Sequence, residues 1–118
     1  MREEIKDIER LQHILEAINV LIDYKERHTL EEAQSDPVVY FGLVKHVKII
    51  GEAVYMLTLE YKEKHNEVNW GDIERMRHVL VHGYYKIRPI QLWETIAVDI
   101  PQLKPYIMKL IEEKLSEQ

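Results

Sequence analysis

The densest group of chemically capable residues in this 118-residue chain lies between Arg75 and Tyr85. An arginine carries a permanent, planar cation whose forked donors fit the oxygens of a phosphate group. A histidine titrates at about pH 6.5, so it can take up and return a proton near neutral pH. Arg77 and His82 supply this pair, and the chemistry that they favour is phosphate binding combined with general acid–base catalysis.

The spacing of the pair limits how it can act. Arg77 and His82 are five residues apart, which on a regular helix turns them about 140° from one another. They converge only if His82 lies at a helix end beside Gly83, or if two copies of the chain meet. Structural roles are open as well: an arginine is often solvated, a terminal histidine caps helix carbonyls, and Tyr84 and Tyr85 can be packing residues.

The distribution of charge along the chain favours an anionic partner only at the segment from Arg75 to Arg88. The chain has a net charge of −5, which argues against a nucleic-acid binder overall. The segment from Arg75 to Arg88, however, holds four of the 16 Lys and Arg residues and none of the 21 Asp and Glu residues. There is no cysteine, so disulfides, thiol catalysis and cysteine-based metal sites are excluded.

The elements that must position these residues are predicted to be helices. Apolar residues recur every three or four positions along most of the chain, and only four Gly and four Pro interrupt them. We therefore expect an all-α, up-and-down bundle of four to five helices, with Asp36 and Pro37 opening the second helix and Pro101 kinking or breaking the fourth. The expected ranges are 2–25, 37–64, 72–82 and 89 onward, with a loop or short turn at 26–35.

The motif residues resemble a known family. Arg77-x4-His82-x-Tyr84 resembles the R-x4-H-x-Y motif of the HepT-like branch of the HEPN family, and His78 fits the polar position that follows the family's arginine. Arg75 departs from the small residue expected at its position. Further similarities to the branch lie in Ile50-Gly51-Glu52-Ala53, Asn69-Trp70, Val81-His82-Gly83-Tyr84, Leu92-Trp93 and Asp99-Ile100-Pro101.

The resemblance implies a function and a set of partners. It implies one HEPN-like domain over residues 1–118, acting as the toxin of a type VII-like HepT/MNT toxin–antitoxin module. Such toxins are metal-independent endoribonucleases without a cofactor, which cut RNA (tRNA or mRNA) at a homodimer cleft. The partner is a minimal nucleotidyltransferase of the MNT type, which neutralises the toxin by AMPylation.

The resemblance also assigns roles to individual residues. Arg77 would hold the scissile phosphate, His82 would act as general acid or base, and His78 would position His82 or the RNA. Tyr84 would be the tyrosine that receives AMP. Glu52 and Tyr85 are expected to support the motif, Glu52 by ordering Arg77 or a neighbour.

Two other functions remain open on the sequence. Glu74, His78 and His82 recur every four residues and form a plausible metal-ligand stripe, although no His-Glu-x-x-His or Glu-x-x-His motif accompanies them. The chain could also be a non-catalytic nucleotide- or substrate-binding partner subunit of a nucleotidyltransferase. The charged N-terminus and the absence of a long apolar run favour a cytoplasmic protein without a membrane segment.

Overall fold

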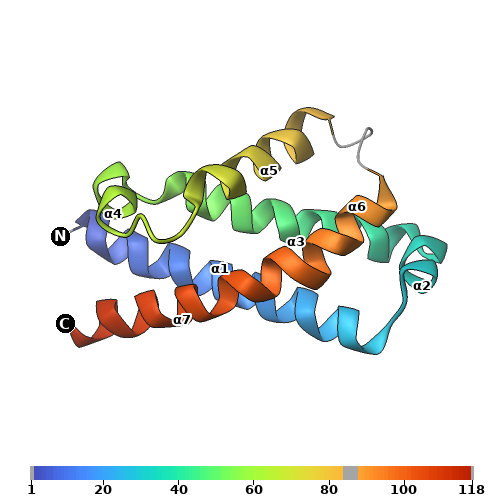
Figure 1. Cartoon of the computed structure of the whole chain (residues 1–118), viewed down its shortest axis with the longest axis horizontal. Coiled ribbons are helices and arrows are strands. Elements are labelled where there is room, and N and C mark those ends of the chain that lie inside the picture. The colour runs from blue at the N-terminus through green and yellow to red at the C-terminus, as the bar shows by residue number, and fades with distance from the viewer. Residues whose placement is uncertain (1, 84–87, 118) are drawn as a thin grey trace.

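The chain folds into a bundle of antiparallel helices (Figure 1). The computed structural model describes the backbone of residues 2–83 and 88–117, and their side chains except those of residues 2–6, 77 and 79–83. Four long helices run up and down, and three short ones lie at their ends. The helices are α1 (Arg2–Arg27), α2 (Leu30–Ser35), α3 (Pro37–Met56), α4 (Leu59–Lys64), α5 (Trp70–Gly83), α6 (Pro89–Glu94) and α7 (Ile100–Ser116), with a π-helical segment, η2 (Thr95–Asp99), between the last two.

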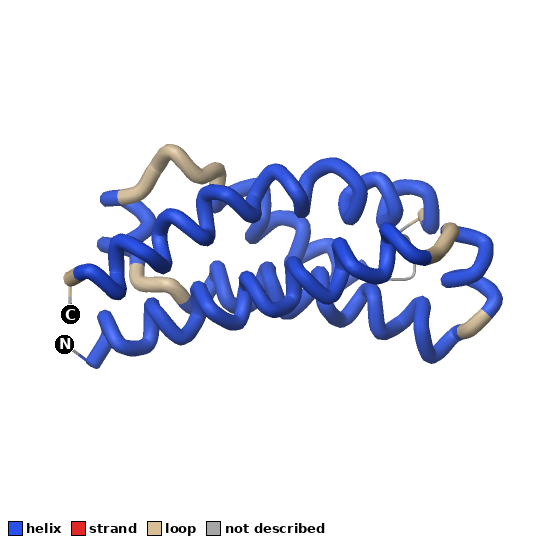
Figure 2. The backbone as a smooth tube through the Cα atoms, turned by 90° about the horizontal axis from the view of Figure 1, so that it is seen from below, coloured by secondary structure: helices blue, strands red, loops and turns tan. Residues whose placement is uncertain are grey.

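The described residues are helical throughout except for short loops, and they contain no strand (Figure 2). The prediction of an all-α, up-and-down bundle is therefore confirmed. Helix α1 packs against both α3 and α7, and α5 packs against α3. The most deeply buried of the described side chains come from α1, α3, η2 and α7. They are Leu11, Ile14, Ile18, Leu21, Val47, Ile50, Val54, Ile96, Ile100, Ile107 and Leu110, and each is less than 2% exposed.

Helix α3 begins where the sequence predicts and ends earlier than predicted. The Asp36 side chain accepts a hydrogen bond from the backbone N–H of Val38, and Pro37 occupies the first turn. We expected the helix to reach Lys64, but this is wrong, because Leu57 and Thr58 adopt extended backbone angles and separate α3 from α4. Apolar residues keep their helical spacing across the break, so this spacing does not predict where α3 ends.

A buried carboxylate holds this break in place. Asp7 on α1 is 2% exposed and accepts hydrogen bonds from the backbone N–H of Thr58 at 3.1 Å and from its hydroxyl at 2.9 Å. The Thr58 oxygen in turn accepts from the backbone N–H of Tyr61, which starts α4. The start of α1 thus fixes the path of the chain 51 residues later.

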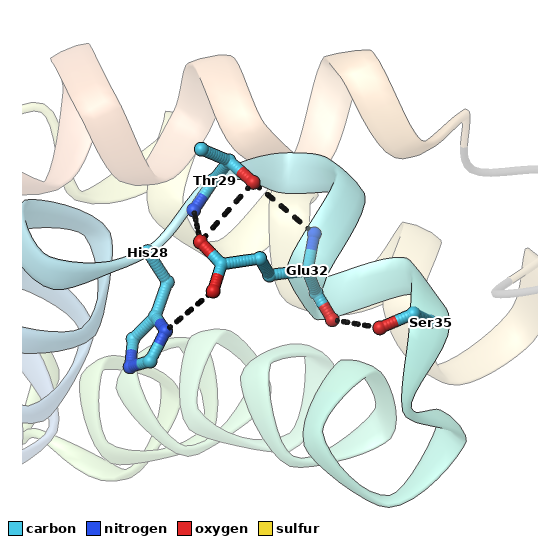
Figure 3. A network of polar contacts seen from close by, with 4 residues as sticks. All are labelled: His28, Thr29, Glu32 and Ser35. Atoms are coloured by element: carbon cyan, nitrogen blue, oxygen red, sulfur yellow. Dashed lines mark hydrogen bonds and ion pairs between the residues drawn. The ribbon is translucent and has the colours of Figure 1, made fainter.

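The predicted loop at residues 26–35 contains a short helix, α2. The Thr29 hydroxyl accepts from the backbone N–H of Glu32 at 3.2 Å, and the Glu32 carboxylate accepts from the backbone N–H of Thr29 at 3.0 Å (Figure 3). This reciprocal arrangement is a capping box. His28 lies 3.5 Å from the second Glu32 carboxylate oxygen, and the Ser35 hydroxyl donates to the Glu32 carbonyl.

Pro101 causes an irregularity without ending the helix. Helices α6 and α7 form one continuous element, interrupted by the π-helical turn η2 (Figure 1). The backbone N–H of Ile100 donates to the carbonyl of Thr95, five residues earlier, instead of four. Because a proline has no N–H to donate and its ring crowds the preceding turn, the helix widens just before Pro101.

Candidate functional site

The helix that bears the motif, α5, is anchored firmly at its first turn. The Asn69 side chain accepts from the backbone N–H of Asp72 at 3.2 Å and donates to the Asp72 carboxylate at 2.6 Å. Trp70 is 7% exposed, and its indole N–H donates to the carbonyl of His65 at 3.0 Å. These contacts satisfy helix-end groups and bury one large ring, so the start of α5 has a single well-defined position.

A short ion pair ties α5 to α4. The ammonium of Lys62 lies 2.6 Å from a carboxylate oxygen of Glu74, and the two side chains are 14% and 33% exposed. Glu74 is one of the three residues of the possible metal-ligand stripe. Its carboxylate is already paired with a cation, which weakens the metal interpretation. Among the described side chains, no three His, Asp or Glu residues are grouped as a metal would require.

The structure places the backbone of both predicted catalytic residues on α5. Arg77 lies in the middle of the helix and His82 in its last turn, directly before Gly83. A position of His82 at the helix end, beside Gly83, is one of the two conditions under which Arg77 and His82 were expected to converge. The side chains of Arg77 and His82 lie outside the described part of the structure. His78 is exposed on the same helix, and the predicted residues Tyr84 and Tyr85 fall outside the described residues.

Glu52 lies on the outer face of α3. Its neighbour Gly51 is buried, whereas the Glu52 side chain is 45% exposed and lies 3.7 Å from the ammonium of Lys48, one turn earlier. The Glu52 carboxylate is therefore accessible on the surface of α3, the helix against which α5 packs.

A cleft of about 730 Å³ opens between α5 and the helix formed by α6, η2 and α7. Its inner wall is apolar, with Val47 of α3 facing Ile73 and Met76 of α5 and Leu103 of α7. Its rim is polar. The rim residues are Glu67, Asn69, Asp72, Arg75, Gln91, Thr95, Asp99, Gln102 and Tyr106.

The cleft was not predicted from the sequence. The π-helical turn supplies Thr95 and Asp99 to its wall, and such turns are frequent at functional sites. Pro101 was a usable signal for the irregularity, but nothing in the spacing of apolar residues shows that α5 stands apart from α7. On the rim, Arg75 forms an ion pair with Asp72.

The fold is thus an all-α, antiparallel bundle whose helix α5 carries the backbone of Arg77 and His82. The sequence matches the family described as ribonuclease HepT-like over residues 14–110, which includes all of the predicted site. The chain belongs to this HepT-like ribonuclease family, as the motif residues predicted.

Several relatives carry ribonuclease names. A protein of Caldanaerobacter subterraneus subsp. tengcongensis, named as an RNase, is 36% identical over 88% of this chain and 93% of its own length. A protein of Thermococcus cleftensis, named as a ribonuclease HepT, is 33% identical over 85% of this chain and 91% of its own. No solved structure matches the chain significantly.

One relative is twice as long as the matched region. A protein of Methanocaldococcus jannaschii, named for both gamma-glutamylcyclotransferase and RNase functions, is 33% identical over 96% of this chain. The chain spans only half of that protein's length. None of the helices described, taken over residues 2–83 and 88–117, has the length and apolar character needed to cross a membrane.

Proposed function

We propose that the protein is an endoribonuclease that cuts RNA without a metal ion, using the R-x4-H-x-Y motif of α5 at the cleft of a homodimer. The observation that carries the proposal is the match to the HepT-like ribonuclease family over a region that contains Arg77, His82 and Tyr84 in the family's order. The exposed position of His78 and the helix-end position of His82 are compatible with access by a polynucleotide.

The proposed reaction needs only groups that the chain and the RNA supply. Arg77 holds the scissile phosphate and stabilises the charge that develops on its oxygens. His82, as base or acid, assists the attack of the neighbouring 2′-hydroxyl on phosphorus. A bond forms from the 2′-oxygen to phosphorus, and the bond to the 5′-oxygen breaks as that oxygen takes a proton. His78, Glu52 and Tyr85 support the motif by positioning it or the RNA.

The protein further acts, in this proposal, as the toxin of a toxin–antitoxin module. Its antitoxin is a minimal nucleotidyltransferase that transfers AMP to the Tyr84 hydroxyl. Tyr84 lies two residues from His82, so the added phosphate would place negative charge where the RNA phosphate must bind. Repulsion between the two anions then excludes the substrate.

Substitution of the motif residues tests the enzyme proposal. Arg77→Ala and His82→Ala should each reduce RNA cleavage by at least a hundredfold, because each removes charge stabilisation or proton transfer at the reacting phosphate. Arg27→Ala, which removes a 73% exposed arginine at the end of α1, outside the basic segment, is the matched control and should retain most of the activity. Cleavage of tRNA and mRNA substrates measures the effect, with helix content by circular dichroism as the check on folding.

The cleft between α5 and α7 favours a second candidate function. Its volume lies in the range of ligand-binding sites, about 300–1,000 Å³, and it combines an apolar wall with a polar rim. A non-catalytic subunit that binds a nucleotide or substrate for a nucleotidyltransferase would use such a cleft. Calorimetry with ATP and AMP on the wild type distinguishes the candidates: nucleotide binding without any RNA cleavage supports the binding subunit and contradicts the ribonuclease.

A further inference from the structure

The two walls of the cleft between α5 and α7 differ in how far their polar side chains are already engaged. At the start of α5 these groups contact one another: Asn69 is hydrogen-bonded to Asp72, and Asp72 is paired with Arg75. On the opposite wall, in the part of the chain that the structure describes, the side chains of Asp99 and Gln102 form no hydrogen bond or ion pair. Both groups are therefore available to a ligand in the cleft.

The cleft residues of the second wall form one stripe along the helix of α6, η2 and α7. They recur there at positions 91, 95, 99, 102 and 106, which are three or four residues apart and thus lie on one side of the helix. This helix and α5 run in opposite directions (Figure 1). The stripe consequently lines the cleft opposite the helix that bears the motif.

Asp99 and Gln102 together offer the hydrogen-bonding groups that match one RNA base. They are three residues apart, so their Cβ atoms lie about 5–6 Å from each other. A carboxylate accepts two N–H bonds side by side, and a glutamine amide can donate one. The Watson–Crick edge of guanine presents two neighbouring donors, N1–H and N2–H, beside the O6 acceptor, and no other RNA base has two neighbouring donors on this edge. The pair of side chains therefore fits guanine.

The rest of the cleft suits the flat faces of a base. Its inner wall is apolar at Ile73, Met76 and Leu103, and Tyr106 lies on the rim with 46% of its surface exposed. Tyr106 is one helical turn beyond Gln102. Because unstacked bases of single-stranded RNA stack on aromatic side chains, a base held at its edge can rest its face on the Tyr106 ring.

The charges around the cleft favour entry of a base and disfavour entry of the phosphate backbone. The carboxylates of Glu67 and Asp99 line the rim, so they repel a phosphate from the interior. Arg75, which is 73% exposed, also lies on the rim, three residues before His78 on the motif helix. An RNA strand that passes the motif can thus keep its backbone beside Arg75 and turn one base into the cleft.

We propose that the cleft between α5 and α7 is a subsite for one unstacked guanine of the RNA substrate. The Asp99 carboxylate accepts from N1–H and N2–H, the Gln102 amide donates to O6, and the Tyr106 ring stacks on the base. This inference rests on the proposed ribonuclease and gives that enzyme a preference for cutting single-stranded RNA at a fixed distance from a guanine. The three side chains position the substrate and transfer no proton in the reaction.

Cleavage of oligouridine with one guanosine, one inosine or one adenosine at its centre tests the base preference. Inosine lacks only the 2-amino group of guanosine, so these two substrates differ by a single hydrogen bond to Asp99. The wild type should cut the guanosine substrate at one fixed distance from the guanine, with kcat/KM at least tenfold above that for inosine or adenosine. Equal cleavage of the three substrates would overturn the proposal.

Asp99→Asn tests which side chain makes the contact. An amide has a single acceptor oxygen, and its NH2 group would oppose a donor of guanine. The ratio of kcat/KM for guanosine over inosine should therefore fall below about threefold. Glu94→Gln makes the same change at an exposed position of the same helix outside the cleft and should keep the wild-type ratio. A ratio that Asp99→Asn leaves unchanged would contradict the role of Asp99, with circular dichroism as the check on folding.

Binding without cleavage separates the subsite from the ribonuclease. Oligonucleotides of the same sequences with 2′-deoxy sugars lack the attacking hydroxyl, and fluorescence anisotropy measures their affinity. The wild type should bind the guanine form at least tenfold more tightly than the inosine form. Tyr106→Leu should weaken the binding of both at least fivefold, whereas Tyr106→Phe should bind as the wild type does.

The proposed function and this subsite fail in different ways. Guanine-selective binding by a protein that cuts no RNA contradicts the ribonuclease and leaves the subsite standing. Cleavage and binding that are indifferent to the base contradict the subsite alone.

Discussion

Asp7 shows how one side chain can control a distant turn of the chain. It is buried, and both of its oxygens accept hydrogen bonds from Thr58. The backbone N–H of Tyr61 donates to the hydroxyl oxygen of Thr58. Burial, and then the nearby Asp7 carboxylate, raise the pKa of the Tyr61 phenol. The ammonium of Lys114 lies 4.8 Å from the centre of the same ring.

Removal of this carboxylate should destabilise the bundle. Asp7→Ala leaves the partly buried N–H and hydroxyl of Thr58 without this acceptor, which costs about 1–3 kcal/mol in the free energy of unfolding. Glu9→Ala, on an exposed position of the same helix, is the matched control and should change it by less than about 0.5 kcal/mol. Urea denaturation measures both, and equal effects of the two substitutions would contradict the role given to Asp7.

Tyr84 tests the proposed regulation separately from catalysis. Tyr84→Phe removes the hydroxyl that would receive AMP and should keep RNA cleavage within about threefold of the wild type, since the proposed chemistry uses Arg77 and His82. Incubation with ATP and the nucleotidyltransferase, followed by mass spectrometry of the intact chain, should show added AMP on the wild type only. Transfer to the Tyr84→Phe variant contradicts the assignment.

At the level of the helices, the capping box of α2 links stability to pH. The backbone N–H of Thr29, and then His28, lower the pKa of the Glu32 carboxyl below its usual value. A group whose pKa is lower in the folded protein stabilises it above the unfolded pKa. That contribution is lost as the pH falls through the lowered folded pKa.

A substitution that cannot ionise should remove this dependence. The wild type should be more stable than Glu32→Gln at pH 7, and the difference should shrink as the pH is lowered past about 4. Thermal unfolding of both proteins between pH 7 and pH 3 measures it. A difference that stays constant over this range would mean that the carboxylate charge contributes nothing to α2.

The helices illustrate what local sequence can and cannot predict. The start of α3 was predictable, because Asp36 and Pro37 are local signals for a helix N-terminus. The pattern of Thr29 and Glu32, three residues apart, is also a local signal, and it could have located α2. The break at Leu57 and Thr58 was not, since its cause is a carboxylate 51 residues away.

For the candidate site, the motif residues could be predicted from the sequence, but the cleft beside them could not. Arg77 and His82 were predicted as site residues because their motif lies within a short stretch of sequence, and the family that the motif resembles is confirmed. The cleft between α5 and α7 was not predicted, because it depends on the spacing in the fold between two helices that are not neighbours in the sequence.

At the scale of the whole molecule, an acidic protein must bind a polyanion through one local surface. The net charge of −5 repels RNA from most of the surface, whereas the segment from Arg75 to Arg88 is basic. In the proposed homodimer, two copies of this segment would double the positive charge at the cleft. This is the physical reason for placing the RNA at the cleft of the proposed homodimer.

The chemistry of the cut RNA ends tests the central claim most directly. Purified wild type, incubated with a defined RNA in excess EDTA, should yield fragments with a 2′,3′-cyclic phosphate on one side of the cut and a 5′-hydroxyl on the other, and His82→Ala should yield none. Cleavage that stops in EDTA and returns with a divalent metal, or fragments with a 5′-phosphate, would contradict a metal-independent ribonuclease that uses the RNA's own 2′-hydroxyl.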